Sequence, residues 1–182
     1  MKKLIMWNVI TVDGYFQGVE PWDLNFHKSV YGEELERFSI EQLDSAEAII
    51  YGSVTYAGMA SYWKDQKGEV ADRVNTMKKY VCTDSLTSTD WHNTEVLSDA
   101  VADITKLKQE GEGNLFIFGS GKLSNSLIKA GLFDEYRLCI APMILGAGRQ
   151  LFESGLPTET LSLLESRTLK TGGVLVHYKV TE

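Results

Sequence analysis

Basic residues and long apolar runs are both scarce in this chain, and each shortage argues against a class of partner. Acidic residues outnumber basic ones by 25 to 18, which gives a formal net charge of −7 and a pI near 5.0. The Lys and Arg residues form no basic stripe, although a duplex nucleic-acid partner requires clustered positive charge. No apolar stretch approaches the length of a membrane span. We therefore expect neither a nucleic-acid partner nor a membrane partner.

Histidine and cysteine are also few, and their spacing suits neither metal binding nor disulfides. The 3 histidines, His27, His92 and His177, form no cluster, so the sequence offers no metal site and no Ser/His/Asp triad. The 2 cysteines, Cys82 and Cys139, lie far apart in strand-like runs, which indicates buried free thiols and a reducing compartment. Polar residues interrupt the apolar start before it takes signal-peptide form, so we expect a cytoplasmic protein.

What the chain does contain is the composition of a globular domain. Hydrophobic residues make up 43% and charged residues 24%, both near the globular average. A length of 182 residues allows one sizeable core and is short for two typical domains. We therefore expect residues 1–182 to form a single domain.

A glycine turn between an apolar run and a helix-like segment is the most informative motif. Gly119, Ser120 and Gly121 follow the run 115–118 and open a segment of helical character over 122–130. The first amides of a helix lack internal partners and lie at its positive end, and glycine lets a phosphate approach the backbone. The turn therefore suits the pyrophosphate of a dinucleotide. The third glycine of the G-x-G-x-x-G fingerprint would fall at Ser124, so the fingerprint is incomplete. An ordinary strand-turn-helix connection of an α/β fold explains the turn as well.

The order of strand and helix patterns predicts an α/β fold. Residues 4–11 are apolar at odd and even positions, which is typical of a central strand covered on both faces. A second buried strand over 46–51 meets an aromatic helix at Gly52 and Ser53, a junction of the same kind as the first. Apolar segments at 161–169 and 174–180 flank a Thr-Gly-Gly turn, which predicts an antiparallel hairpin. We expect a mixed, mostly parallel sheet with helices on both faces and this hairpin at its C-terminal end.

Two helix boundaries can be predicted from spacing and capping residues. Apolar residues at helical spacing predict one helix over 26–38, and Ser39 with Gln42 has the form of a capping box that would begin a second helix. Ser98 is placed to cap a helix over 99–110.

A set of segments distributed over the second half of the chain matches one known family; these segments are residues 118–123, 127, 130–132, 134–138, 141–142, 145–148 and 151–152. They closely resemble the reductase domain of riboflavin-biosynthesis deaminase-reductases and stand-alone relatives in the dihydrofolate-reductase-like superfamily. Residues 11–15 look like that family's first-strand turn, and residues 52–56 look like its second nucleotide loop. Together these segments span nearly the whole chain in the expected order.

The resemblance implies a dihydrofolate-reductase-like three-layer fold, NADPH as the hydride donor, a small-molecule substrate and often a homodimer. It places the glycine turn against the cofactor's pyrophosphate, the second loop on another phosphate contact, and the strand end at 83–85 near the adenosine ribose. The cofactor-binding residues that it implies are Gly52, Ser53, Thr55, Thr83, Asp84, Ser85, Gly119, Ser120, Gly121, Lys122 and Leu123.

One position departs from the family pattern. Many relatives have Arg or Lys directly after the glycine of the second loop, where the charge favours the extra phosphate of NADPH, and this chain has Ser53. NADH is therefore an alternative donor. Lys78 or Lys79 could supply the missing charge, although both could equally be solvated surface lysines.

The reacting end of the site is harder to identify from sequence. Trp22 followed by Glu34 echoes dihydrofolate reductase, in which a proline-tryptophan loop precedes a helix with an acidic substrate ligand. Glu34 could then bind a ring and help to deliver a proton, or it could be an exposed helix residue. Asp13 could lie beside the nicotinamide pocket, or it could simply stabilise an Asp-Gly turn. Trp22, Tyr56 and Met59 could form the wall of a substrate site, or they could pack in the core.

Two classes of function fit these observations. The first is an NAD(P)H-dependent reductase of a small heterocycle, with 5-amino-6-(5-phosphoribosylamino)uracil as the first substrate to consider and a pterin as the second. Hydride transfer needs little more than a positioned donor and acceptor and excluded water, so the absence of a catalytic motif is compatible with it. The second is a nucleotide-binding homodimer that retains the fold without turnover.

Overall fold

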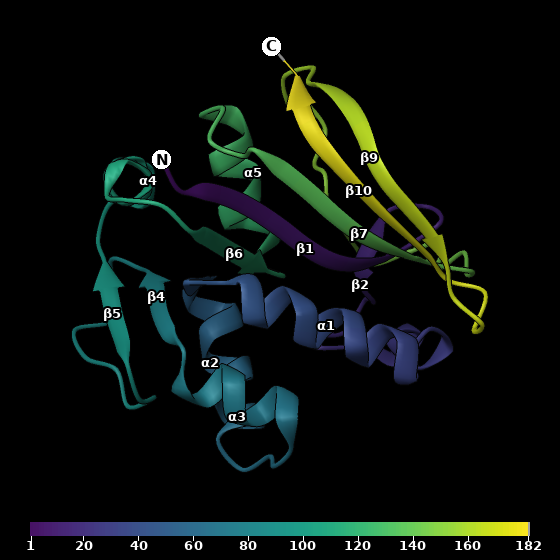
Figure 1. The fold of residues 1–182 in the computed structure, drawn as a ribbon, viewed down its shortest axis with the longest axis horizontal. Helices are drawn as coiled ribbons and strands as arrows, with labels where there is room; N and C mark the ends of the chain where they lie inside the picture. The colour runs from purple at the N-terminus through teal and green to yellow at the C-terminus, as the bar shows by residue number, and fades with distance from the viewer. Residues whose placement is uncertain (182) are drawn as a thin grey trace.

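The computed structural model describes residues 1–181, and its centre is one eight-stranded sheet in the order β5-β4-β3-β6-β1-β7-β10-β9 (Figure 1). The first six strands in this order are parallel, and β10 and β9 add an antiparallel hairpin at one edge. The strands are β1 (Lys3–Thr11), β3 (Ala48–Gly52), β4 (Lys78–Cys82), β5 (Thr94–Leu97), β6 (Asn114–Phe118), β7 (Glu135–Ala141), β9 (Thr160–Thr168) and β10 (Val174–Thr181). The predicted α/β fold with a mixed, mostly parallel sheet is confirmed.

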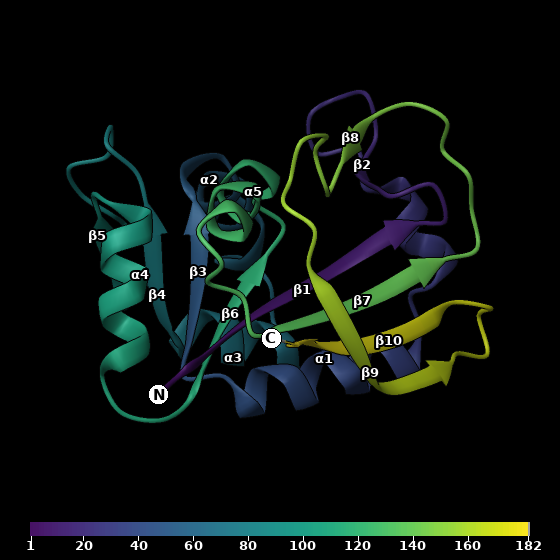
Figure 2. The same ribbon diagram turned by 90° about the horizontal axis from the view of Figure 1, so that it is seen from above.

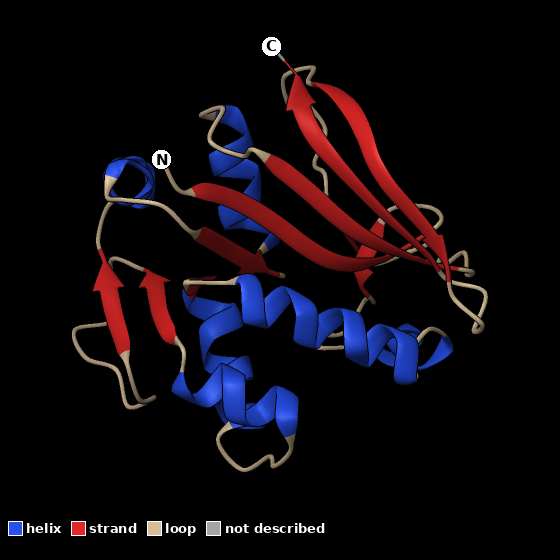
Figure 3. Cartoon of the chain, viewed as in Figure 1, coloured by secondary structure: helices blue, strands red, loops and turns tan. Residues whose placement is uncertain are grey.

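Helices cover both faces of the sheet, as Figures 1 and 3 show. One face carries α1 (Glu33–Ser45), α2 (Ser53–Trp63) and α3 (Glu69–Thr76), and the other carries α4 (Ala100–Gln109) and α5 (Gly121–Lys129). A 3-10 helix, η1 (Asn25–Ser29), and a small ribbon of β2 (Tyr15–Gln17) with β8 (Arg149–Gln150) complete the described chain. In residues 1–181, no helix is both long and apolar enough to cross a membrane.

The central strand β1 is apolar on both faces because it separates two cores. Leu4 and Met6 pack with the buried residues of α4 and α5, whereas Ile5 and Trp7 pack with those of η1 and α1. Successive side chains of a strand point to opposite faces, so consecutive apolar residues are needed wherever both faces are covered. This pattern explains why β1 could be predicted as a central strand.

Two predicted helix boundaries are wrong. The segment expected as one helix over 26–38 divides into η1 and α1, and α1 then continues through Ser39 to Ser45. The Ser39 hydroxyl donates to the carbonyl of Leu35 at 2.9 Å, one turn earlier, and so begins no new helix. At α4 the cap is Asp99, whose carboxylate accepts from the amide of Ala102 at 3.0 Å, and not Ser98.

The direction in which the chain adds strands to the sheet reverses between β3 and β6, which are parallel neighbours. The chain leaves β3 through α2 and α3 to β4 on one side, and it leaves β6 through α5 toward β7 on the other side. The two helices that follow these adjacent strands therefore lie on opposite faces of the sheet. A crevice forms outside the carboxyl ends of the strands at such a switch point, and open α/β sheets bind their ligands there.

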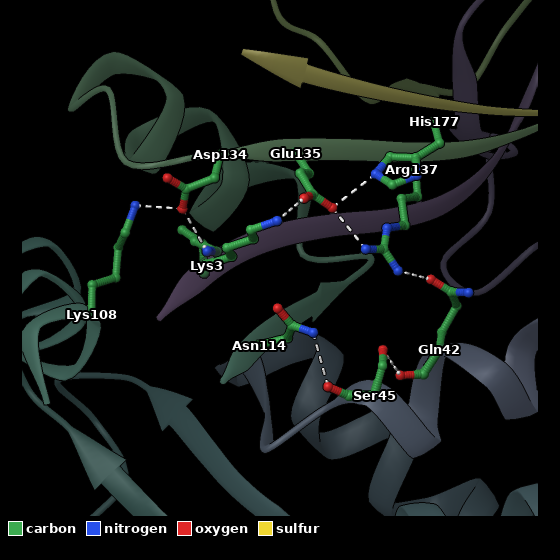
Figure 4. Close-up of polar contacts among 10 residues, drawn as sticks. Lys3, Gln42, Ser45, Lys108, Asn114, Asp134, Glu135, Arg137 and His177 are labelled. Atoms are coloured by element: carbon green, nitrogen blue, oxygen red, sulfur yellow. Dashed lines mark hydrogen bonds and ion pairs between the residues drawn. The ribbon is translucent and has the colours of Figure 1, made fainter. Parts of the chain in front are cut away.

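A buried charge network joins the hairpin to the parallel part of the sheet (Figure 4). The carboxylate of Glu135 accepts from Lys3 at 2.8 Å, from Arg137 at 2.7 Å and pairs with His177 Nε2 at 2.8 Å. Burial alone would raise the pKa of Glu135, but these three partners outweigh it and lower the pKa to about 2. Arg137 also donates to the side chain of Gln42 in α1, so the network reaches the covering helix.

We expect Glu135→Gln to destabilise the fold by on the order of 3 kcal/mol at pH 7, because Lys3 and Arg137 lose the charge that compensates them. The folded-state pKa of Glu135 is depressed to about 2. Its contribution is therefore complete above the unfolded value near 4.5 and declines as the pH falls toward 2. Urea unfolding from pH 7 to pH 3 measures the difference between wild type and variant. The control is Glu165→Gln, an exposed acid on β9. A difference that does not shrink at low pH would contradict the assignment.

Candidate functional site

A mostly apolar cavity of about 520 Å³ opens at the crevice between β3 and β6. Its lining comes from strands β1, β2, β3, β4, β6 and β8, from η1, α1, α2, α3 and α5, and from the start of α4. α2 and α5 overlap in Figure 2 because they lie on opposite faces of the sheet, and the β2–β8 ribbon lies to their right. The cavity therefore lies where the topology of a parallel sheet directs a ligand.

Two hydrogen bonds hold the helix starts in place around the crevice. The amide of Gly119 donates to Asn8 Oδ1 in β1 at 2.8 Å, and the amide of Gly52 donates to Ser120 Oγ at 3.0 Å. Gly119 and Ser120 both have positive φ, 61° and 56°, a conformation that glycine adopts freely and serine adopts at a cost. The hydroxyl of Ser120 thus ties the turn after β6 to the end of β3. The two junctions that the sequence predicts as nucleotide-binding turns line one cavity.

Both helix starts present free amides toward this cavity. No side chain of residues 1–181 caps the first turn of α2 or of α5. The cations Lys122 and Arg149 line the cavity, and its described lining includes no Asp or Glu. The helix dipoles and these two cations make a locally positive site in an acidic protein.

The β2–β8 ribbon closes the cavity beside α5. Gln17 of β2 pairs with Arg149 of β8, which places Arg149 in the lining. Phe16 packs so closely on Gly121 that a Cβ there would lie 2.8 Å from the phenyl ring. A side chain at position 121 would therefore displace the Phe16 ring.

Trp22 covers another part of the cavity and rests on α2. Its backbone has a φ of 65°, and its indole lies where a side chain of residue 58 would be. A Cβ on Gly58 would come within 1.9 Å of the indole. The absence of a side chain at Gly58 thus lets Trp22 cover the cavity.

The structure brings most of the predicted binding residues into the cavity lining. These are Gly52, Ser53, Thr55, Gly119, Ser120, Gly121, Lys122 and Leu123, together with Trp22 and Met59. Thr83, Asp84 and Ser85 do not line it. Thr83 and Ser85 form a turn in which their hydroxyls are 3.1 Å apart, and Ser85 faces a separate cavity of about 360 Å³ beside α2.

Three other predicted residues lie outside the main cavity. Tyr56 is buried on the far side of α2, where its hydroxyl accepts from the amide of Trp91 at 3.2 Å. Glu34 accepts from the amide of Lys170 at 2.6 Å and so binds the β9–β10 turn. Asp13 accepts from the amides of Leu145 at 3.1 Å and Gly146 at 2.7 Å. Their side chains therefore have structural partners elsewhere.

The interactions of Asp13 hold a loop and do not approach the cavity. The Thr11 hydroxyl, which donates to Asp13 at 2.6 Å, does most to lower the pKa of this carboxyl, and the amides of Gly146 and Leu145 add to the effect. The resulting pKa is about 2, so Asp13 is ionised at neutral pH. Asp13 therefore binds the loop at residues 145–146, which is remote in sequence, and does not act on its own Asp-Gly turn alone.

The lysines that were considered for a cofactor phosphate are also engaged. Lys79 is fully buried, and its ammonium donates to the carbonyls of Val74, Asn75 and Met77 at the end of α3. Lys78 pairs with Glu95 at 2.8 Å. Neither lysine lines the main cavity, so the expectation that one of them replaces the missing cation at Ser53 has no support from their positions.

The cavity also contains residues that sequence reasoning missed. Asn8 lies in a run that is typical of a buried strand, and only its bond to Gly119 shows its importance. His27 is neutral because burial lowers its pKa to about 4. Phe16 and Arg149 come from the β2–β8 ribbon, which joins segments far apart in sequence. A polar residue in an otherwise apolar strand was the one available signal for Asn8.

A family model described as the RibD C-terminal domain matches residues 2–175. The uncharacterized protein YyaP of Bacillus subtilis (strain 168) is 24% identical over 191 aligned residues, which cover 97% of this chain and 94% of the relative.

Two solved structures share the fold. A candidate riboflavin biosynthesis protein of Shewanella sp. PV-4 matches with a TM-score of 0.81 at 18% identity, covering 99% of both chains. The dihydrofolate reductase of Enterococcus faecalis, solved in complex with NADP(H), matches with a TM-score of 0.66 at 14% identity, covering 99% of this chain and 97% of the enzyme. The predicted dihydrofolate-reductase-like fold is therefore confirmed.

We expect Gly58→Ala to displace Trp22 from α2 without destabilising the protein, because alanine favours a helix interior by about 1 kcal/mol over glycine. Acrylamide quenching measures the exposure of Trp22, with the same measurement on Trp22→Phe variants to isolate its signal. Quenching should increase in Gly58→Ala and stay unchanged in the control Ser61→Ala, an exposed position of the same helix. Equal quenching in both variants would show that Trp22 does not depend on Gly58.

Proposed function

The chain belongs to the RibD C-terminal domain family, and on this basis we propose that it is a reductase that uses a nicotinamide dinucleotide to reduce a small heterocyclic substrate. The observation that carries the proposal is the pair of uncapped helix starts, α2 and α5, which meet at one cavity without a carboxylate in its described lining. A negatively charged linker binds most favourably where free amides and positive charge converge. A carboxylate in the wall of the same cavity would repel such a linker.

The residues around the crevice fit a dinucleotide in two ways. The amides of residues 53–55 and 121–123 are available to phosphate oxygens, and Lys122 and Arg149 add positive charge. Glycine at positions 52 and 119 lets the two turns lie close together, since a Cβ at Gly52 would be 3.6 Å from Leu123 and one at Gly119 would be 3.4 Å from Thr55, and Ser120 joins the two turns. When bound, the nicotinamide would supply the hydride.

We propose NADPH as the first donor to test and NADH as the second. Ser53 provides a hydroxyl where many relatives have a cation, and Lys78 and Lys79 are engaged elsewhere. Thr83, Asp84 and Ser85 remain proposed contacts for the adenosine ribose, next to the smaller cavity that Ser85 lines.

The other end of the cavity suits a flat ring. Its walls include Trp7, Trp22, Leu24 and Tyr31, which exclude water around a reacting ring, and Met59 lies in the same lining. The described lining offers no carboxylate as a proton donor, so we propose that Asp13 and Glu34 support the surrounding loops and do not contact the substrate. The ring of 5-amino-6-(5-phosphoribosylamino)uracil is the first substrate to test, and dihydrofolate is the second.

Titration with NADPH and NADH, followed by nicotinamide fluorescence, tests the cofactor site. We expect saturable binding, weakened about tenfold by Lys122→Gln or Arg149→Gln because each removes one charge-assisted contact. The control is Lys129→Gln, which removes the same charge from the last turn of α5. No saturation with either nucleotide would reject the proposal. Binding without turnover of any carbonyl, imine or pterin acceptor would leave the nucleotide-binding homodimer instead.

We also propose that two copies associate through the edge strand β9. Leu163 and Leu164 are 53% and 50% exposed on this strand, and an open edge with exposed apolar side chains favours pairing with another chain. Sedimentation should therefore give a dimer, and Leu163→Lys should shift it toward the monomer. The same shift with Val54→Lys, an exposed position on α2, would show that the effect is not specific to β9.

A further inference from the structure

The helices along the crevice differ in the charge at their first turns. β3, β5 and β6 belong to the same parallel part of the sheet, so α2, α4 and α5, which follow them, begin at one edge. Within residues 1–181, the first turns of α2 and α5 have no side-chain cap and no acidic residue. The start of α4 instead has Asp99 as its cap, bonded to the amide of Ala102 at 3.0 Å, and Asp103 in its first turn. The starts of α2 and α5 are therefore open to an anion, whereas carboxylates already occupy the start of α4.

The main cavity extends along this edge from the open helix starts toward the acidic one. Its lining includes Ser53 and Lys122 in the first turns of α2 and α5, and it also includes Cys82 at the end of β4 and Ala100 at the start of α4. Burial, with a smaller contribution from the charge of Asp103, raises the pKa of the Cys82 thiol to about 12. Asp103 therefore lies close to this end of the cavity wall. The positive potential of the open helix starts declines in the same direction.

The ends of β3 and β4 bring Ser53 close to the turn that carries Asp84. Gly52 and Cys82 are register partners in these parallel strands, so the residues that follow them, Ser53 and Thr83, leave the sheet at the same edge. Asp84 comes next, with an exposed side chain. Ser53 lines both the main cavity and the smaller one beside α2, to whose lining the turn after β4 also contributes. A group bound where the two cavities adjoin therefore lies near Ser53 and this turn.

The turn after β4 offers few donors to a phosphate. The Thr83 hydroxyl accepts from the amide of Ser85 at 3.1 Å and from the amide of Leu86 at 3.4 Å. The amide of Thr83 donates to the carbonyl of Leu97 in the next strand at 2.9 Å. A backbone amide carries a single proton, so these amides are not available to a ligand oxygen. The free charge of this turn is the carboxylate of Asp84, which accepts hydrogen bonds and donates none.

The lysines next to α2 and in β4 are already engaged. Lys64, which lines the smaller cavity, pairs with Asp90 at 2.6 Å. Lys78 and Lys79 begin β4, at the opposite end of the strand from Cys82, and they have partners there. A phosphate monoester beside Ser53 would therefore meet the carboxylate after β4 without gaining a counter-charge from these lysines. Like charges placed together oppose binding, whereas a hydroxyl in the same place can donate to the carboxylate.

We propose that this chain discriminates against the 2′-phosphate of NADPH and binds NADH more tightly, with Ser53 and Asp84 facing the adenosine ribose. This inference rests on the proposed function and specifies the cofactor of that site. The pyrophosphate lies at the open starts of α2 and α5, and the Asp84 carboxylate accepts a hydrogen bond from a ribose hydroxyl. A 2′-phosphate replaces this donor with a second negative charge. The family resemblance points to NADPH, whereas the residues at this end of the cavity fit an unphosphorylated ribose.

Titration of the full chain with two pairs of ligands tests the proposal. NADH and NADPH are followed by nicotinamide fluorescence, and ADP-ribose and its 2′-phosphate are followed by calorimetry. The second pair lacks the nicotinamide ring and so isolates the adenosine end. Asp84→Asn removes the charge and keeps an acceptor oxygen, while Ser53→Arg places a cation where many relatives have one. The control is Glu112→Gln, which removes the same charge from an exposed position in the loop before β6.

We expect wild type to bind NADH and ADP-ribose about tenfold more tightly than their 2′-phosphorylated counterparts. Asp84→Asn should reduce this preference, Ser53→Arg should abolish or reverse it, and the control should leave it unchanged. Equal or tighter binding of the phosphorylated ligands by wild type would overturn the inference and leave the reductase proposal in place. A preference that Asp84→Asn and Glu112→Gln change equally would also overturn it. Absence of saturable binding of every ligand would overturn both the inference and the proposed function.

Discussion

The cavity depends on two hydrogen bonds that join the carboxyl ends of three neighbouring strands. Asn8 in β1 holds the turn after β6 through the amide of Gly119, and Ser120 in that turn holds the end of β3 through the amide of Gly52. Because α2 and α5 leave on opposite faces of the sheet, nothing in their own packing requires their first turns to meet. These two bonds bring the first turns of the helices together, and the positive ends of both helix dipoles therefore meet at the cavity.

The distribution of charge follows the same arrangement. The protein is acidic overall, yet its carboxylates are absent from the described cavity lining. Several acids near the sheet have partners of their own: Glu135 lies among three basic groups, Asp13 binds the amides of a loop, and Glu34 binds the amide of a hairpin turn. In these contacts the carboxylates stabilise the fold and do not face the cavity. The electrostatic field in the cavity therefore comes from the helix ends, Lys122 and Arg149.

The predicted and observed sites differ in a consistent way. The two junctions at which a glycine joins a strand to a helix could be predicted from sequence because the features that define them are local: the backbone conformation, the free amides and the small side chains adjoin in sequence. The sequence left both a site role and a structural role open for Asp13, Glu34 and Tyr56, and in the structure each binds a distant partner: the loop at Leu145, the hairpin at Lys170 and the amide of Trp91. A sequence shows which chemistry a side chain can perform, whereas its partner depends on packing between remote segments.

The sequence by itself determined the succession of strands and helices, both glycine junctions, the C-terminal hairpin and the family resemblance. These features depend on the periodicity of apolar residues and on residues close together in the chain. Only the tertiary structure decided that both junctions meet at one cavity, that Asn8 holds the turn at Gly119, and that Arg149 reaches the cavity. These features arise from contacts between strands and loops far apart in sequence. Such contacts leave no periodic signal, because any of several polar residues could have been brought to the same place.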